Sequence, residues 1–161
     1  MNMQVKIGIG YDIHRFVPGR KLVLGGVDVP HSKGLSGYSD ADIIIHAVCD
    51  AILGALGEGD IGLHFPDTDP KYKDISSLKL LKKVQGMLEK KHFKVGNIDV
   101  MLLLEAPKIA FFKDRMRSNI SKILKIAAAQ VSIKATTAEG IGEIGRGKAA
   151  AAYAVALISK K

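Results

Sequence analysis

The chain has 161 residues, of which 47% are hydrophobic and 25% are charged. This composition is typical of a soluble globular protein, so we expect a single domain over residues 1–161. The formal net charge of +8 suits an anionic ligand, but the lysines lie at helical spacing without interleaved aromatic residues, which argues against nucleic acid as the partner. No apolar run reaches the roughly 20 residues of a membrane helix, and the single Cys49 cannot form an internal disulfide, so we expect a cytoplasmic protein that binds no membrane.

The N-terminal third predicts a strand, a hairpin and a helix. Alternating polar and apolar residues predict the strand over residues 4–9. Short apolar segments on either side of Gly25-Gly26 predict a two-residue hairpin. Ser39 or Asp40 is a suitable N-cap for an apolar helix that would end at the glycines near residue 57.

The middle of the chain predicts two more helices and a buried strand. Residues 58–74, rich in Asp, Gly and Pro, are expected to form a loop. Apolar residues three to four apart predict a helix around residues 78–88, and the apolar run 98–104 predicts a strand. Pro107 is expected to open a third helix with Phe111 on its apolar side.

The C-terminal part contains one ambiguous element. Residues 131–135 predict a strand, and residues 140–147 predict a loop because they include four glycines. Over residues 148–158 the alanines favour a helix, whereas Tyr153 and Val155 alternate with small residues as in a strand. The pattern as a whole indicates an α+β domain with helices on one side of a sheet.

Three residues could form a metal site. Asp12 and His14 follow the first strand two residues apart, so on an extended backbone their side chains point to the same face. His46 lies on an otherwise apolar helical turn. Two histidines and a carboxylate suit zinc with an open fourth position, as in catalytic sites. The alternative is that Asp-x-His occurs by chance and that His46 is a packed core residue.

Two aspartates at the start of the same helix admit two interpretations. Asp40 and Asp42 could cap the helix, or they could support the metal-binding histidine through hydrogen bonds. Two interpretations also hold for the acidic segment 65–70. Its aspartates could simply form a turn, or its two prolines could stiffen a wall that binds a hydroxyl-rich ligand.

A threonine and glycine segment near the C-terminus suits phosphate binding. Threonine hydroxyls and loop amides around residues 136–147 can hold phosphate oxygens, Arg146 can clamp them, and Glu139 can hold a magnesium ion. The segment is not a P-loop, because it lacks the Gly-Lys-Ser/Thr ending. Lys108 is a further candidate for an anionic ligand, although surface lysines are common.

Six short motifs contain most of these candidates. They are Gly-Tyr-Asp-Ile-His at 10–14, Ser-Asp-Ala-Asp-Ile-Ile-Ile-His at 39–46, Gly-Asp-Ile-Gly at 59–62 followed by Phe-Pro-Asp-Thr-Asp-Pro at 65–70, Glu-Ala-Pro-Lys at 105–108, Lys-Ala-Thr-Thr-Ala-Glu at 134–139 and Gly-Arg-Gly at 145–147. Their order and spacing over essentially the whole chain resemble the 2-C-methyl-D-erythritol 2,4-cyclodiphosphate synthase family.

The resemblance implies an α+β subunit with a four-stranded mixed sheet and helices on one face. It makes residues 148–158 a strand. Three such subunits would assemble as a homotrimer around their sheets, with each active site between neighbouring subunits. The implied enzyme is a phosphorus–oxygen lyase of the non-mevalonate isoprenoid pathway. It would convert 4-diphosphocytidyl-2-C-methyl-D-erythritol 2-phosphate to 2-C-methyl-D-erythritol 2,4-cyclodiphosphate and release CMP.

The resemblance also implies roles for individual residues. Asp12, His14 and His46 would bind zinc or another divalent transition metal, and Glu139 would bind magnesium or manganese with the substrate diphosphate. Thr137 and the residue at position 38 would act on the transition state. The implied substrate-binding residues are Asp12, Ile13, His14, Tyr38, Ser39, Asp60, Ile61, Gly62, Phe65, Pro66, Asp67, Thr68, Asp69, Leu104, Glu105, Ala106, Pro107, Lys108, Ile109, Ala110, Thr136, Thr137, Ala138, Glu139, Glu143 and Arg146.

Four positions depart from the family pattern. Tyr38 stands where a histidine is usual, and its hydroxyl can donate a hydrogen bond but cannot carry positive charge near neutral pH. Glu143 replaces a common aromatic residue, Ile9 a frequent histidine and Lys148 a frequent glutamate. The last two would touch an axial cavity of the trimer, where Arg146 lies and an isoprenoid diphosphate could bind.

Three other functions compete with the cyclising enzyme. A zinc-dependent phosphoester hydrolase could use the same residues to activate water. A trimer that only binds isoprenoid diphosphates is a second alternative, which the Tyr38 departure favours and the intact metal residues oppose. A basic nucleic-acid-binding domain is the third, and no recognised motif supports it.

Overall fold

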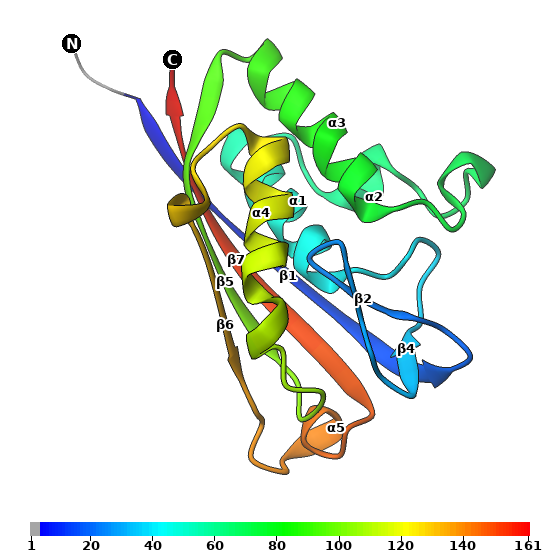
Figure 1. Ribbon diagram of the computed structural model, residues 1–161. Coiled ribbons are helices and arrows are strands. Elements are labelled where there is room, and N and C mark those ends of the chain that lie inside the picture. Colours follow the sequence, from blue (N-terminus) through cyan, green and yellow to red (C-terminus); the bar gives the residue numbers. More distant parts are fainter. Residues whose placement is uncertain (1–3) are drawn as a thin grey trace.

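The computed structural model describes residues 4–161, so residues 1–3 of the expected domain lie outside it. Over the described residues the chain forms one five-stranded sheet in the order β4-β1-β7-β5-β6 and a separate two-stranded hairpin. Helices α1, α3 and α4 cover one face of the five-stranded sheet (Figure 1). The strands are β1 (Val5–Pro18), β2 (Leu22–Leu24), β3 (Val27–Val29), β4 (Lys33–Leu35), β5 (Phe93–Leu103), β6 (Val131–Thr136) and β7 (Ala149–Lys160). The helices are α1 (Ile43–Leu56), α2 (Ile61–His64), α3 (Ser77–Lys90), α4 (Lys113–Leu124) and α5 (Gly142–Gly145).

The sheet is mixed, as expected, but it has one strand more than the four predicted. Strand β7 lies between β1 and β5 and is antiparallel to both, whereas β5 and β6 are parallel. The additional strand is β4, whose residues Lys33–Leu35 pair with the end of β1 at residues 16–18. It extends the sheet because β1 continues well past its predicted end.

Strand β1 is much longer than its sequence pattern indicated. It pairs with β7 continuously from Val5 opposite Ser159 to Arg15 opposite Ala149. Asp12 and His14 therefore lie within the strand, not after it, and they still point to the same face. The ambiguous C-terminal segment is a strand, because hydrogen bonding to a neighbour on each side outweighs the intrinsic helix preference of its alanines.

Helix α1 begins at a different cap from the one predicted. The N-cap is Asp42, whose carboxylate accepts a hydrogen bond from the backbone N–H of Ile45, so the prediction of Ser39 or Asp40 was wrong. The same carboxylate accepts from the backbone N–H groups of Gly25 and Gly26 at 2.9 and 2.6 Å. Asp42 thus joins the start of α1 to the predicted hairpin, which the structure confirms as β2 and β3.

Helix α1 packs against β1 at two positions that lack side chains. A Cβ atom at Gly8 would lie 1.9 Å from the carbonyl oxygen of Ala51, and one at Gly10 would lie 1.9 Å from that of Ala47. Such overlaps with backbone atoms are impossible without moving the helix. Glycine on the strand and alanine on the helix therefore allow α1 to lie directly on the sheet.

Three segments predicted as irregular or as helix differ in the structure. The expected loop over residues 58–74 contains α2 and a 3₁₀ turn at Pro70–Tyr72, and the glycine-rich loop contains the short α5. The third helix does not open at Pro107; α4 begins at Lys113, after a 3₁₀ turn at Ala110–Phe112. Phe111 is 93% exposed, because the 3₁₀ turn changes the angular phase on which its predicted burial depended.

The face of the sheet opposite the helices is apolar and exposed. Its large side chains come from the two central antiparallel strands, and Ile7 and Ile9 are 69% and 68% exposed. The exposed members of this face are Val5, Ile7, Ile9, Tyr11, Ile13, Tyr153 and Val155. Among residues 4–161, none of the helices has both the length and the apolar character needed to cross a bilayer.

The contact between α1 and β1 is testable with Gly10→Ala. The added methyl would overlap the carbonyl of Ala47, so we expect the free energy of unfolding, measured in urea, to fall by about 3 kcal/mol or more. Gly86→Ala is the matched control, because a Cβ there meets open space within α3 and should stabilise the helix by about 0.5–1 kcal/mol. Equal effects of the two substitutions would contradict the packing argument.

Candidate active site

Asp12, His14 and His46 converge where α1 crosses β1. Each offers one ligand atom, and these atoms all lie within 4.8 Å of one another. Nδ1 of His46 is 2.9 Å from one Asp12 carboxylate oxygen, and Nδ1 of His14 is 3.1 Å from the other. The two histidine rings are 5.6 Å apart. The three residues predicted from the sequence therefore form one cluster, as a shared metal ion would require.

The electrostatics of this cluster concentrate negative charge on Asp12. Burial alone would raise the pKa of Asp12, but hydrogen bonds and charge interactions with His14 and His46 outweigh it and lower the pKa to about 2. Burial likewise opposes the charged form of His46, yet the carboxylate of Asp12 raises the pKa of His46 above its usual value. The carboxylate thus stays ionised and attracts a positive charge between itself and the rings.

The donor set fits a divalent transition metal. Two imidazoles and one carboxylate leave a coordination position open, which is the pattern of catalytic zinc. Nδ1 of His14 is buried, and its 3.1 Å contact with Asp12 is not aligned as a regular hydrogen bond. A buried nitrogen with so weak a contact is costly, and a metal ion beside Asp12 would satisfy it.

The second nitrogen of His46 faces a group of hydroxyls. Nε2 lies 2.9 Å from Oγ of Ser77 and 3.1 Å from Oγ of Ser39. Ser77 donates a short hydrogen bond to Asp40. Of the two aspartates considered above, Asp40 therefore supports the histidine through Ser77, whereas Asp42 caps the helix. Ser77 was missed by sequence reasoning, because a serine at a helix start predicts only capping.

Segment 37–39 holds the other side of the cluster in place. The guanidinium of Arg20 donates to the backbone carbonyls of Gly37 and Ser39 at 3.1 and 2.6 Å. Tyr38 turns its hydroxyl toward the acidic loop and donates to the carbonyl of Asp69 at 3.4 Å. Tyr38, which stands where a histidine is usual, therefore links segment 37–39 to the loop predicted to form the binding wall.

A cavity of about 290 Å³ opens beside the two histidines. It brings His14, Tyr38, Ser39 and His46 together with Phe65 and Asp67 of the acidic loop. It is not lined by Asp60, Ile61, Gly62, Pro66, Thr68 or Asp69. Asp60 instead caps α2 through the N–H of Leu63, and Asp69 accepts from the N–H of Lys71, so both take the structural role that turn-forming aspartates often have.

Most of the other predicted binding residues gather in a second hollow of about 330 Å³ at the ends of β5 and β6. Glu105 accepts a hydrogen bond from the N–H of Ala138 at 2.7 Å, and the hydroxyl of Thr137 donates to Glu139 at 2.9 Å. The hollow is lined by Leu104, Glu105, Pro107, Lys108, Ile109, Ala110, Lys113, Ala135, Thr136 and Thr137. Ala106, Ala138 and Glu139 do not line it.

The two hollows lie at the same level on opposite edges of one sheet. Ile13 of β1 pairs with Ala151, Ala151 with Leu103 and Leu103 with Thr136. Ile13 and Thr136 are therefore three strand spacings apart, or about 14 Å. One chain does not bring the cluster of Asp12, His14 and His46 and the threonine segment into a single site.

The charged residues of the glycine-rich segment form a third group. Arg146 and Lys148 both contact the carboxylate of Glu143, at 3.5 and 3.4 Å. Glu143 and Lys148 share a hollow of about 570 Å³ with Ile13 and His14. Glu143, which stands where the family commonly has an aromatic residue, thus pairs with neighbouring cations.

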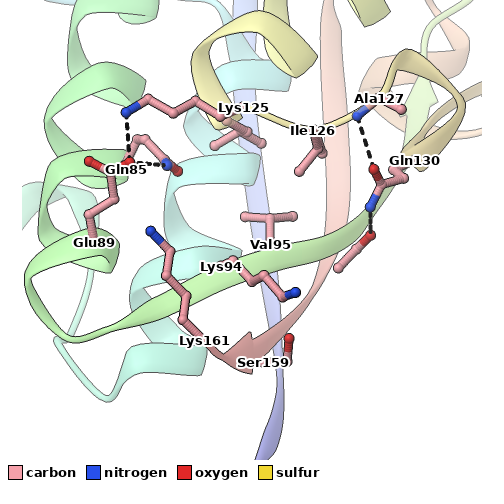
Figure 2. Close-up of a pocket in the computed structure, with 12 residues that line it drawn as sticks. Gln85, Glu89, Lys94, Val95, Lys125, Ile126, Ala127, Gln130, Ser159 and Lys161 are labelled. Carbon is pink, nitrogen blue, oxygen red and sulfur yellow. Dashed lines mark hydrogen bonds and ion pairs between the residues drawn. The ribbon is translucent and has the colours of Figure 1, made fainter.

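A further hollow of about 560 Å³ contains none of the predicted site residues (Figure 2). Gln85, Lys94, Lys125 and Lys161 are among its lining residues. Figure 2 shows Lys125 and Gln85 bonded to Glu89 across its rim. Because none of the candidate catalytic or metal-binding residues lines this hollow, its size alone does not indicate a reaction site.

Comparison with known proteins decides the family. The YgbB family matches residues 5–159. A 2-C-methyl-D-erythritol 2,4-cyclodiphosphate synthase of Chlorobium phaeovibrioides is 58% identical over 156 residues, covering 97% of this chain and 99% of that protein. One of Caldicellulosiruptor bescii is 56% identical over 95% of this chain and 98% of that protein. The chain belongs to this synthase family.

Solved structures of the synthase family share the fold. The Plasmodium falciparum IspF in complex with CDP is 36% identical, with a TM-score of 0.86 over 98% of this chain and 97% of that one. The bifunctional IspDF of Campylobacter jejuni is 38% identical with a TM-score of 0.95. The match covers 99% of this chain and 43% of the bifunctional protein.

Proposed function

We propose that the chain converts 4-diphosphocytidyl-2-C-methyl-D-erythritol 2-phosphate to 2-C-methyl-D-erythritol 2,4-cyclodiphosphate and CMP, in the non-mevalonate isoprenoid pathway. The observation that carries the proposal is the convergence of Asp12, His14 and His46 beside a cavity, in a chain of the synthase family. The reaction is an intramolecular displacement. An oxygen of the 2-phosphate bonds to the β-phosphorus, and the bond from that phosphorus to the bridging oxygen breaks as CMP leaves.

Asp12, His14 and His46 would hold zinc or another divalent transition metal, and Glu139 would hold magnesium or manganese together with the substrate diphosphate. When bound, the two cations would offset the charge of the phosphates and of the departing CMP. Magnesium commonly binds one or two carboxylates and completes its shell with phosphate oxygens and water, so a single exposed glutamate suits this role.

The residues of this chain have mainly to position the substrate. The attacking phosphate is already anionic, so the reaction needs no strong general base. Phe65 and Asp67 would hold the methylerythritol part, and residues 104–110 with Lys108 would frame the cytidine phosphates. The hydroxyls of Tyr38 and Thr137 would donate hydrogen bonds to phosphoryl oxygens in the transition state. Holding a flexible substrate bent for reaction can contribute up to roughly 7–11 kcal/mol in favourable intramolecular cases.

We further propose a homotrimer with each site between two subunits. Two observations support it: the two candidate hollows lie on opposite edges of one sheet, and the sheet face without helices is apolar and exposed. Packing three such faces together would bury them and bring the zinc cluster of one chain against the threonine segment of the next. In this arrangement Asp60, Ile61, Gly62, Pro66, Thr68 and Asp69 would contact the same substrate.

Four finer assignments complete the proposal. The chain is a single catalytic domain over residues 1–161 and a phosphorus–oxygen lyase. Because Cys49 is a buried free thiol, which suits a reducing compartment, we infer a cytoplasmic location. Arg146 and Glu143 would face the axial cavity of the trimer, where an isoprenoid diphosphate could pair with the arginine.

The reaction is testable by phosphorus NMR with the cytidylylated substrate, zinc and magnesium. We expect CMP and a cyclic diphosphate, both lost on chelation, and we expect His46→Ala to abolish turnover while the trimer persists. His31→Ala is the control, because this exposed histidine lies outside the cavity. An open-chain diphosphate would identify a hydrolase, and normal turnover by zinc-free His46→Ala would overturn the metal assignment.

The composite site is testable by mixing inactive chains. His46→Ala and Glu139→Ala damage different halves of the site, so random mixed trimers should contain about one intact site in four and recover that share of activity. His46→Ala mixed with Asp12→Ala is the matched control, because every site then lacks a zinc ligand. Equal recovery in the two mixtures, or none in either, would contradict sites between subunits.

A further inference from the structure

A chain of buried hydrogen bonds leads away from His46 on the side opposite the metal cluster. Nε2 of His46 lies 2.9 Å from Oγ of Ser77. The hydroxyl of Ser77 donates to one oxygen of Asp40, and the other oxygen of Asp40 accepts from the backbone N–H of Ser77 at 3.0 Å. Ser77 is fully buried, and Asp40 also donates its own N–H to the carbonyl of Ile75. Hydrogen bonds therefore fix both Ser77 and Asp40 in place.

The inventory of protons fixes the direction of this chain. A serine hydroxyl has a single proton, and the carboxylate of Asp40 accepts from both the hydroxyl and the backbone N–H of Ser77. The proton of Ser77 therefore points to Asp40, and its oxygen is left to accept from His46. Nε2 of His46 must then carry the hydrogen. The hydroxyl oxygen of Ser39, 3.1 Å from the same nitrogen, accepts from the N–H of Ala41 and has a second lone pair that can share the hydrogen of Nε2.

The other nitrogen of the ring is the one that faces the metal cluster. Nδ1 of His46 lies 2.9 Å from Asp12 and hydrogen-bonds to it. When a metal ion displaces the proton of Nδ1, the hydrogen on Nε2 remains and Nδ1 offers its lone pair to the metal. We propose that Ser77 and Asp40 are positioning residues, which prepare His46 to bind the metal through Nδ1 by holding its other nitrogen protonated. The inference rests on the proposed metal role of His46. Hydrogen bonds of this kind orient metal-binding histidines and raise their basicity.

A merely structural role for Ser77 makes a different prediction. The backbone N–H of Ser77 already anchors the start of α3 to Asp40, and this bond survives any change of the side chain. Loss of the hydroxyl should therefore affect the metal more than the fold. If the hydroxyl only filled space, its loss would lower stability and leave metal affinity unchanged.

The test measures zinc affinity of the full-length protein by competition with a chelator. We expect Ser77→Ala to bind zinc about 10–100-fold more weakly than the unsubstituted protein, with the thermal unfolding temperature measured alongside. Ser121→Ala is the matched control, because Ser121 is also a buried helical serine, but its hydroxyl donates only to the carbonyl of Ser118 within α4. Unchanged zinc affinity in folded Ser77→Ala, or an equal loss in Ser121→Ala, would overturn the proposal.

A second pair of variants separates the hydroxyl from side-chain volume. Ser77→Thr and Ser77→Val have nearly the same shape, so any strain from the added methyl group is shared between them. The threonine variant should bind zinc at least tenfold more tightly than the valine variant. Equal affinities in this pair would overturn the proposal even if Ser77→Ala failed to fold.

A spectroscopic measurement reports on the proton itself. Nitrogen NMR of the zinc-loaded protein should show the hydrogen of His46 on Nε2, and a metal bound at Nε2 would overturn the proposal. Failure of the proposed reaction is recognised separately, in the unsubstituted protein. A protein that binds zinc but forms no cyclic product would refute the reaction and leave the Ser77 comparison intact.

Discussion

The close contact between α1 and β1 governs the rest of the structure. The carbonyls of α1 lie so near the strand that only hydrogen atoms fit at Gly8 and Gly10. This distance brings His46 on the helix within hydrogen-bond reach of Asp12 on the strand. A larger residue at Gly10 would push the helix outward at Ala47, the residue next to His46. Packing and site geometry therefore depend on the same two glycines.

Three aspartates around this contact have three different tasks. Asp12 stays ionised between two imidazoles, with its pKa lowered to about 2. Asp40 accepts two hydrogen bonds from Ser77, whose hydroxyl contacts Nε2 of His46 on the side away from Asp12. Asp42 is fully buried, and burial with the charge of Asp40 raises its pKa to about 6 although three backbone N–H groups favour its ionised form. Position relative to α1, and not residue type, separates these roles.

The division of the predicted residues between two edges of one sheet shapes the function. Antiparallel pairing with β7 places the cluster of Asp12, His14 and His46 near the β4 edge, while the parallel pair β5 and β6 carries the threonine segment at the other edge. In the proposed trimer, a substrate that needs both groups would reach them across a boundary between chains. The exposed apolar face formed by β1 and β7 makes such an assembly favourable, because burying it removes large hydrophobic side chains from water.

The sequence by itself determined the chemistry of the site and much of the fold. Residue types at Asp12, His14 and His46 predicted a two-histidine, one-carboxylate site, and the motifs predicted the family, because these features depend on short-range spacing. The ends of elements were less predictable. Strand β1 runs past its alternating pattern and α1 is capped by Asp42, because hydrogen bonds to residues distant in sequence decide these boundaries. Helix α4 starts after Pro107, behind a 3₁₀ turn that the apolar pattern did not indicate.

Only the tertiary structure decided which residues meet. The fifth strand, the convergence of the three candidate ligands and the link from Asp40 through Ser77 to His46 join segments separated by up to 37 residues. No local pattern in the sequence records such contacts. They arise because α1 packs on β1 while α3 brings Ser77 to the same point, and each position is set by packing of the whole core.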